Sequence, residues 1–317
     1  MQLPGNLKIL RRQLVAAIFA VAVSAVSLTA STYAWYVANQ AVTGTTSTIS
    51  ATSDDTVLFI VQGLTPDHGS GSTVAAVPGH PITPSSTDNV KDWYVPLKWV
   101  DSLSKVETYQ KVSLTTTDEY GVADGSYTLN GDAYYAYNVK TFTLYTVRDT
   151  SKANVYLDAD APGGAIIITR NVGGTQVAVT DKVAASIRVG IVVNDELKFV
   201  YAPVEPSGHG NDVYSIDNNV TGWTVVNNTS STKAASYAHI SGNNVSDWAI
   251  SRGADSKYYN PATAGSNKVA ENVDYNGVKF QIYVWMEGTD ADCNGPTVSG
   301  DKSEYSVTVH LAGVATG

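Results

Sequence analysis

The densest group of potential metal ligands in the sequence is an acidic turn near the C-terminus. Residues 282–293 read IYVWMEGTDADC and bring Glu287, Asp290 and Asp292 within six residues of one another. Carboxylate oxygens are the hard ligands that Ca²⁺ prefers, so the three side chains could form a calcium site. No EF-hand spacing is present, and the pattern also fits a solvated turn in which Asp290 and Asp292 cap their own backbone. We expect the solvated turn, with calcium as the alternative and no other cofactor.

Aromatic side chains in a polar region offer a second kind of binding chemistry. Residues 206–276 are rich in Asn, Ser and Gly, and Trp223 and Trp248 belong to their two apolar anchors. If exposed, these rings could stack on sugars, as in an adhesin or a glycan-binding module. If buried, they would form a small core that holds the region in place. We expect the second arrangement, in a long surface insertion on the main domain.

The catalytic patterns that a sequence can reveal are missing. None of the five histidines lies in a His-Glu-x-x-His pattern, and the chain has no Gly-x-Ser-x-Gly elbow and no phosphate-binding or dinucleotide-binding loop. The single cysteine, Cys293, follows acidic neighbours that disfavour a thiolate, so we expect a buried, small apolar side chain. The sequence therefore predicts a protein that is not an enzyme.

The charge of the chain excludes two classes of partner. Lys and Arg number 20 against 29 Asp and Glu, a formal net charge of −9. A protein this acidic is repelled by phosphate backbones, so we expect no nucleic-acid partner. It also lacks the basic patches that hold proteins to anionic lipid. With one cysteine there is no internal disulfide, and stability must come from packing and strand pairing.

The N-terminal part has the layout of an export signal. Residues 13–53 contain no charged side chain. The apolar run 14–28 follows a basic cluster and precedes small residues, which predicts a signal peptide over residues 1–34 and a secreted protein. Contact with the membrane would then end at cleavage. A retained membrane helix is the alternative, because residues 14–37 approach the roughly 20 apolar residues that a span needs.

The second half of the uncharged stretch, residues 35–53, is predicted to be an extended strand. It is rich in Thr, Ser, Ala and Val and carries no charge that would discourage pairing. This strand could join its own sheet or lie against the sheet of a neighbouring molecule, and the sequence leaves both open. In the second case Trp35, Val37, Val42 and Ile49 are the side chains that would enter the acceptor's groove.

Residues 54–317 are predicted to form one all-β domain, a jelly-roll-like β-sandwich with long loop insertions. Ten or so short strands alternate with turn signals, and no helix of ordinary length interrupts them. The almost continuously apolar segment 184–193 is expected to be a central strand. Residues 134–147 alternate like a strand with one half-buried face. Pro96 marks residues 93–99 as an edge strand, because proline cannot donate to a ladder.

The glycines and prolines of residues 63–88 predict a loop without regular structure.

Taken together, these segments resemble the TasA/camelysin-like surface proteins of Gram-positive bacteria. The resemblance covers the framework of the chain, but neither residues 206–276 nor residues 63–88. It is carried by four segments in this order: Ser31-Thr-Tyr-Ala-Trp-Tyr36, Ile187-Arg-Val-Gly190, Tyr201-Ala-Pro203 and Trp285-Met-Glu-Gly-Thr-Asp-Ala-Asp-Cys293.

This resemblance implies a jelly-roll subunit that a dedicated signal peptidase releases and that is built into fibres of the extracellular matrix. In such fibres the N-terminal strand of one subunit completes the sheet of the next, so the contact propagates head-to-tail without closing. The expected function is thus a structural subunit of a matrix fibre or pilus-like filament at the cell surface or in a biofilm. The expected partners are further copies of itself and other matrix subunits. An adhesin and a pilin-like subunit with a retained N-terminal helix stay open as alternatives.

Overall fold

The computed structural model describes residues 46–53, 58–69, 72–87, 89–100, 105–172, 175–178, 182–203, 238–254, 267–288, 290, 293 and 304–316. In this part of the chain the regular structure is almost entirely β-strand, with two short helical segments, α2 (Lys182–Ser186) and η2 (Gly242–Asp247). The prediction of an all-β sandwich is confirmed. The predicted signal peptide, residues 1–34, lies outside the described residues.

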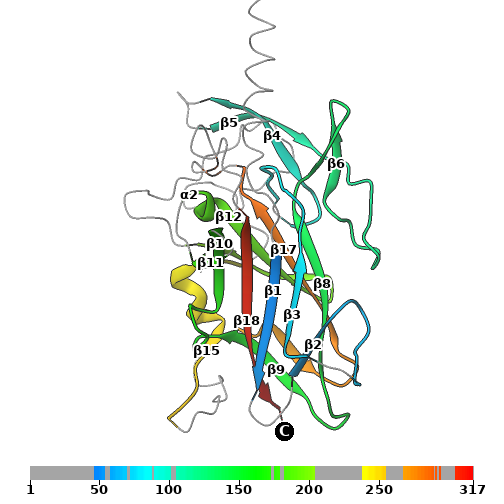
Figure 1. Cartoon of the computed structure of the whole chain (residues 1–317), viewed down its shortest axis with the longest axis vertical. Coiled ribbons are helices and arrows are strands. Elements are labelled where there is room, and N and C mark those ends of the chain that lie inside the picture. The colour runs from blue at the N-terminus through cyan, green and yellow to red at the C-terminus, as the bar shows by residue number, and fades with distance from the viewer. Residues whose placement is uncertain are drawn as a thin grey trace, which may run out of the picture.

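Two sheets make up the sandwich (Figure 1). The first sheet runs in the order β11 (Thr175–Ala178), β10 (Ile166–Val172), β18 (Tyr305–Ala315), β1 (Thr46–Ser53) and β3 (Val74–Pro78), and β9 (Ala153–Asp158) pairs with the second half of β18 and with β15 (Ala249–Ile250) and β16 (Ala270–Val273). The second sheet runs in the order β14 (Ala238–Ser241), β13 (Glu196–Ala202), β12 (Ile187–Val193), β17 (Val278–Met286), β8 (Asn138–Thr146) and β2 (Leu58–Gln62).

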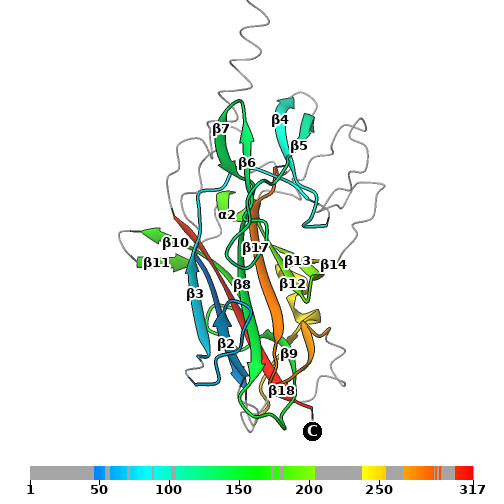
Figure 2. The same ribbon diagram turned by 90° about the vertical axis from the view of Figure 1, so that its right-hand side faces the viewer.

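Two short ribbons sit at one end of the sandwich (Figure 2). They are β4 (Tyr94–Val100) with β5 (Lys105–Lys111), and β6 (Ser126–Leu129) with β7 (Asp132–Tyr135). β4 pairs with β5 alone among the described strands, and its register shifts at Pro96. This agrees with the expectation of an edge strand at that proline.

The main core fills the space between the two sheets. Apolar residues spaced two apart on β18, at Val307, Val309 and Leu311, are fully buried there. From the second sheet, Phe142 and Ile282 face them. This spacing is what a strand needs to bury one face, because successive side chains point to opposite sides of the sheet.

A second core covers the outer face of the second sheet. Trp93 stacks on Tyr137 at 4.2 Å and meets Trp285 edge-on at 5.4 Å, between that face and the segments around β4 and β6. Gly190 makes room for this packing, since a Cβ at Gly190 would lie 3.2 Å from the ring of Trp285. The middle strands of the second sheet, β12, β17 and β8, are therefore covered on both faces, whereas an antiparallel sheet often leaves one face to solvent.

This burial corrects one expectation and confirms another. Every residue of β8 except Lys140 is buried, so the strand does not have one half-buried face as its alternation suggested. The pattern misled because the chain after β2 covers this face: the Thr143 hydroxyl donates to the carbonyl oxygen of Gly63 at 2.7 Å, and the Tyr145 hydroxyl donates to that of Asp67 at 2.6 Å. The prediction of a central strand in the apolar segment 184–193 is confirmed, because β12 lies between β13 and β17 and all its residues are buried.

The structure differs from the predicted loops in two places. Residues 63–88 contain β3, whose Val74-Ala-Ala-Val77 run pairs with β1 despite the surrounding prolines and glycines. The region 206–276 is not only a surface excursion: β14 extends the second sheet, and β15 and β16 extend the first.

Candidate functional site

Strand β1 lies inside the first sheet of its own chain. It pairs in parallel with β18 from Thr46↔Ser306 to Ser53↔Gly313, and in antiparallel fashion with β3 from Thr46↔Pro78 to Ser50↔Val74. In the single chain, the described part of the predicted extended segment therefore completes its own sandwich rather than a neighbour's (Figure 1). Of the four candidate donor-strand residues the structure describes Ile49, which lies in the sheet of its own chain; its insertion into a neighbouring copy stays a prediction. Trp35, Val37 and Val42 lie outside the described residues.

β1 contributes little to the core that it enters. Ile49 is its one large apolar side chain and is fully buried. Ser47 is also fully buried, and its hydroxyl has no hydrogen-bond partner among the described residues, which leaves a desolvated polar group in the core. Ala51 is small. β1 is therefore held mainly by its backbone ladders with β18 and β3, of which the parallel one is slightly less stable per residue than an antiparallel one.

Two side-chain contacts fix β1 in its groove. Ser50 Oγ lies 2.6 Å from Nδ1 of His310, its register partner on β18. Ser53 Oγ accepts a hydrogen bond of 3.1 Å from the backbone N–H of Leu58, where the chain enters the second sheet. Burial lowers the pKa of His310 below its usual 6.5, and the negative charge of Asp158 opposes this only in part. His310 is accordingly neutral at pH 7.

The acidic turn is not a solvated turn. Asp290 is fully buried and forms an ion pair with Arg188, which is also fully buried; Arg188 Nη2 and Asp290 Oδ2 are 2.6 Å apart. Arg188 Nη1 donates to the carbonyl oxygens of Ala185 at 2.6 Å and Ile187 at 3.1 Å. These contacts compensate for the removal of both charges from water.

Glu287 is buried beside this pair and bonded to different partners. Its carboxylate accepts hydrogen bonds from Ser86 Oγ and, at 3.1 Å, from Trp285 Nε1. Its backbone N–H donates to the carbonyl oxygen of Ser186 at 2.8 Å. The next residue, Gly288, passes so close to Pro96 that a Cβ there would lie 2.9 Å from its ring.

The calcium alternative does not fit this geometry. Glu287 and Asp290 are both fully buried and bonded to protein donors. In the described part of the chain, no three His, Cys, Asp or Glu side chains gather as metal ligands would. Asp292 lies outside the described residues. Cys293 is 2% exposed, which confirms the expectation that it is buried.

Trp248, the one aromatic candidate that the structure describes, is not part of a surface platform. Trp248 is 7% exposed and packs against Phe199 at 4.7 Å in the main core, so it belongs to the buried arrangement. Trp223 lies outside the described residues.

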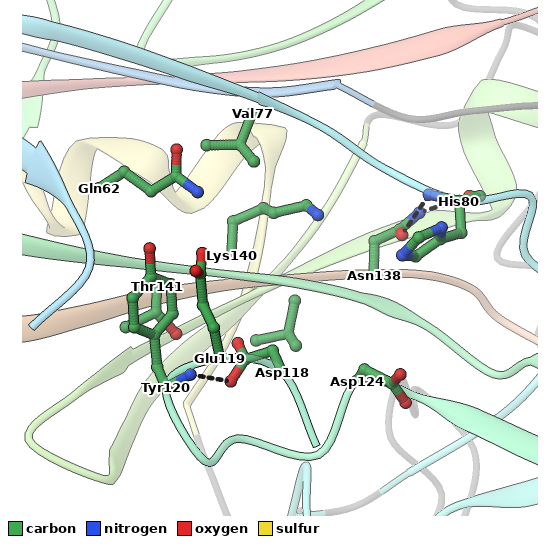
Figure 3. Close-up of a pocket in the computed structure, with 11 residues that line it drawn as sticks. Gln62, Val77, His80, Asp118, Glu119, Tyr120, Asp124, Asn138, Lys140 and Thr141 are labelled. Carbon is green, nitrogen blue, oxygen red and sulfur yellow. Dashed lines mark hydrogen bonds between the residues drawn. The ribbon is translucent and has the colours of Figure 1, made fainter. Parts of the chain in front are cut away.

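A pocket of about 100 Å³, which sequence reasoning missed, opens where the edges of the two sheets separate (Figure 3). Its walls come from the ends of β2, β3 and β8 and from the loop of residues 112–125, segments far apart in the sequence. Polar side chains line most of it: Gln62, His80, Asp118, Glu119, Tyr120, Asp124, Asn138, Lys140 and Thr141. The one signal in the sequence was Lys140, a charged residue in a strand whose other side chains are uncharged.

The pocket's side of β8 is fastened to the chain that follows β3. The N–H of His80 donates to Asn138 Oδ1 at 2.7 Å, and Asn138 Nδ2 donates to the carbonyl oxygen of His80 at 2.8 Å. The ring of His80 stacks on Tyr135. Burial lowers the pKa of His80, Lys140 lowers it further and Asp124 opposes both, so His80 is neutral at pH 7.

No family model matches the chain, and the searches of curated proteins and of solved structures return no similar protein either. Within the described ranges, no helix is long and apolar enough to cross a membrane.

Proposed function

We propose that the protein is a secreted structural subunit that polymerises head-to-tail into an extracellular fibre by exchanging strand β1 between copies. This proposal follows the resemblance to the TasA/camelysin-like proteins. The observation that supports it best is the position of β1, a strand with one large apolar side chain that lies between β18 and β3 of its own sheet.

The cis position of β1 is compatible with exchange. A strand that leaves the groove between β18 and β3 exposes the ladder of β18 and the pocket that Ile49 fills. An identical strand from another copy restores the same contacts, as in domain swapping. Because donor strand and acceptor groove are different surfaces, each subunit could give its strand to one neighbour and receive one from another.

The make-up of β1 favours exchange over permanent docking. Its hydroxyl-rich sequence, TSTISATS, buries one large apolar side chain, so little apolar area has to be exposed on release. In the described part of the fold, β1 continues only into β2 of the other sheet, so its release leaves the ladder between β18 and β10 intact. β3 pairs with β1 alone among the described strands and would rejoin the sheet only when another β1 enters.

A pair of cysteines across the β1–β3 ladder tests the proposal. Thr48 and Ala76 are register partners, and paired antiparallel residues lie within the Cα separation that a disulfide accepts. The native Cys293 is buried and does not compete. In the T48C/A76C variant of residues 35–317, oxidation of monomers should give an intramolecular disulfide and block fibre growth. Oxidation of preformed fibres should give a covalent ladder on a denaturing gel.

The single variants T48C and A76C are the matched controls, and neither should give a ladder longer than a dimer. Oxidised monomers of the double variant that still form fibres as fast as reduced ones would show that β1 stays in its own sheet. Absence of fibres from the wild-type chain by electron microscopy, at any concentration tested, would overturn the proposal as a whole.

A further inference from the structure

We propose that the pocket between β2, β3, β8 and the 112–125 loop binds a neutral sugar through two adjacent hydroxyl groups. This inference does not depend on fibre formation. Figure 3 shows the two sides of the pocket: Asp118, Glu119 and Tyr120 come from the loop, and Lys140 and Gln62 come from the strands opposite.

Lys140 supplies the hydrogen-bond donor. It is the one residue of β8 that is not buried, and it shares a strand face with Phe142 and Leu144, which belong to the main core. Its ammonium group has no hydrogen bond or ion pair with any residue that the structure describes. Burial lowers the pKa of Lys140, and Asp118 opposes this. A half-buried ammonium without a bonded partner gains from a ligand oxygen.

Asp118 supplies the acceptor, and its own loop holds it in place. Its Oδ1 accepts hydrogen bonds of 2.9 Å from the backbone N–H groups of both Tyr120 and Val122. These bonds fix the orientation of the carboxylate before any ligand arrives and leave further lone pairs on it. A fixed acceptor loses little entropy on binding.

The charges of the pocket decide which ligands it admits. Asp118, Glu119 and Asp124 outweigh the one ammonium of Lys140, because His80 is neutral at pH 7. Anionic ligands are therefore disfavoured. The described carboxylates do not form a metal-binding group either.

A vicinal diol fits what remains. A hydroxyl group both donates and accepts, so one hydroxyl can accept from the ammonium of Lys140 while its neighbour donates to the carboxylate of Asp118. Tyr120, whose ring packs against Gly63, lines the same pocket. A volume of about 100 Å³ holds several water molecules, and the edge of one pyranose ring could replace them. The geometry points to a terminal neutral hexose.

The test is titration calorimetry of residues 35–317 with the methyl glycosides of glucose, galactose and mannose, and with glucuronic acid as an anionic probe. At least one neutral glycoside should bind, and glucuronic acid should not. K140M, which keeps the length of the side chain, should weaken binding by about tenfold, as expected for loss of a charged hydrogen bond. D118N should do the same while keeping an oxygen for the loop's N–H groups.

K268M is the matched control, since Lys268 is a lysine that pairs with Glu271 away from the pocket, and its affinity should equal that of the wild type. A lysine near an edge strand can also simply discourage edge pairing. If that is its role, no neutral glycoside should bind to the wild type, or K140M and D118N should bind the glycosides as tightly as the wild type does. Either result overturns the proposal. Binding of glucuronic acid alone would overturn the ligand class.

Discussion

Arg188 and Asp290 form an ion pair that is closed off from solvent, with 2.6 Å between Nη2 and Oδ2, although 102 residues separate them in the chain. Arg188 lies on the central strand β12, and Asp290 lies in the turn after β17. The pair thus connects two of the segments that carry the resemblance to TasA/camelysin-like proteins. Glu287, beside it, bonds to Ser86 and so fastens the same turn to the chain after β3.

Breaking this pair from one side should destabilise the fold strongly. D290N leaves the guanidinium of Arg188 buried without its counter-charge, and we expect a loss of about 3–5 kcal/mol in the free energy of unfolding. Urea denaturation followed by tryptophan fluorescence measures it. E196Q, which breaks the exposed Lys198–Glu196 pair, is the control and should change stability by less than about 1 kcal/mol. A similar small effect for D290N would show that the buried pair contributes little.

The sequence predicted the strands of this fold better than it predicted the buried ion pair of Arg188 and Asp290. The apolar run of β12 identified a central strand, because a strand covered on both faces has no polar side. The acidic turn was misjudged, because its partner Arg188 is distant in sequence and nothing local marks Asp290 as buried. The sequence also could not tell whether β1 pairs with its own sheet or with that of a neighbouring molecule, because Thr, Ser and Ala fit both arrangements equally well.

Gly288 should be required for the close approach of the acidic turn to β4. A methyl group at this position would lie 2.9 Å from Pro96 Cγ and 3.0 Å from its Cδ. G288A should therefore cost about 1–3 kcal/mol of stability, the range for overpacking. G69A is the control, because its Cβ would meet only Asp67 at 3.5 Å. Equal melting temperatures for the two variants would contradict the prediction.

Stability should fall as the pH drops below about 6.5. The pKa values of His80 and His310 are lowered in the folded protein, so the unfolded chain takes up these protons first as the solution becomes acidic. The unfolded state then binds more protons than the folded state, and stability rises with pH across this window. The free energy of unfolding, measured from pH 8 to pH 5, should show this slope.

The variant H310N shows how much of this pH dependence comes from His310. Asparagine places a polar atom near the position of Nδ1, so the contact with Ser50 can be kept while the titrating group is removed. H310N should flatten the pH dependence below about 6.5 without changing its sign, since His80 still titrates. An unchanged slope would mean that His310 does not contribute to it.

Export should remove the N-terminal segment. If residues 1–34 are a signal peptide, mass spectrometry of the secreted protein should find a chain that begins near Trp35. A full-length chain recovered from the membrane fraction would instead support the pilin-like alternative, in which the N-terminal helix is retained.

Ser47 offers a way to separate the stability of β1 in its groove from its capacity to exchange. Its buried hydroxyl has no partner, so S47A should raise the free energy of unfolding by about 1 kcal/mol or more, because a desolvated polar group is removed. The same groove would receive the strand in a fibre, so the variant should stabilise monomer and fibre alike. Before it can exchange, however, β1 must leave its own groove, and this release should be slower in S47A. Fibre assembly followed by light scattering should therefore show a longer lag for S47A than for the wild type, but an equal final yield of fibres. T48A, on the outer face of the same strand, is the control and should leave the lag unchanged; a shorter lag for S47A would contradict exchange of β1.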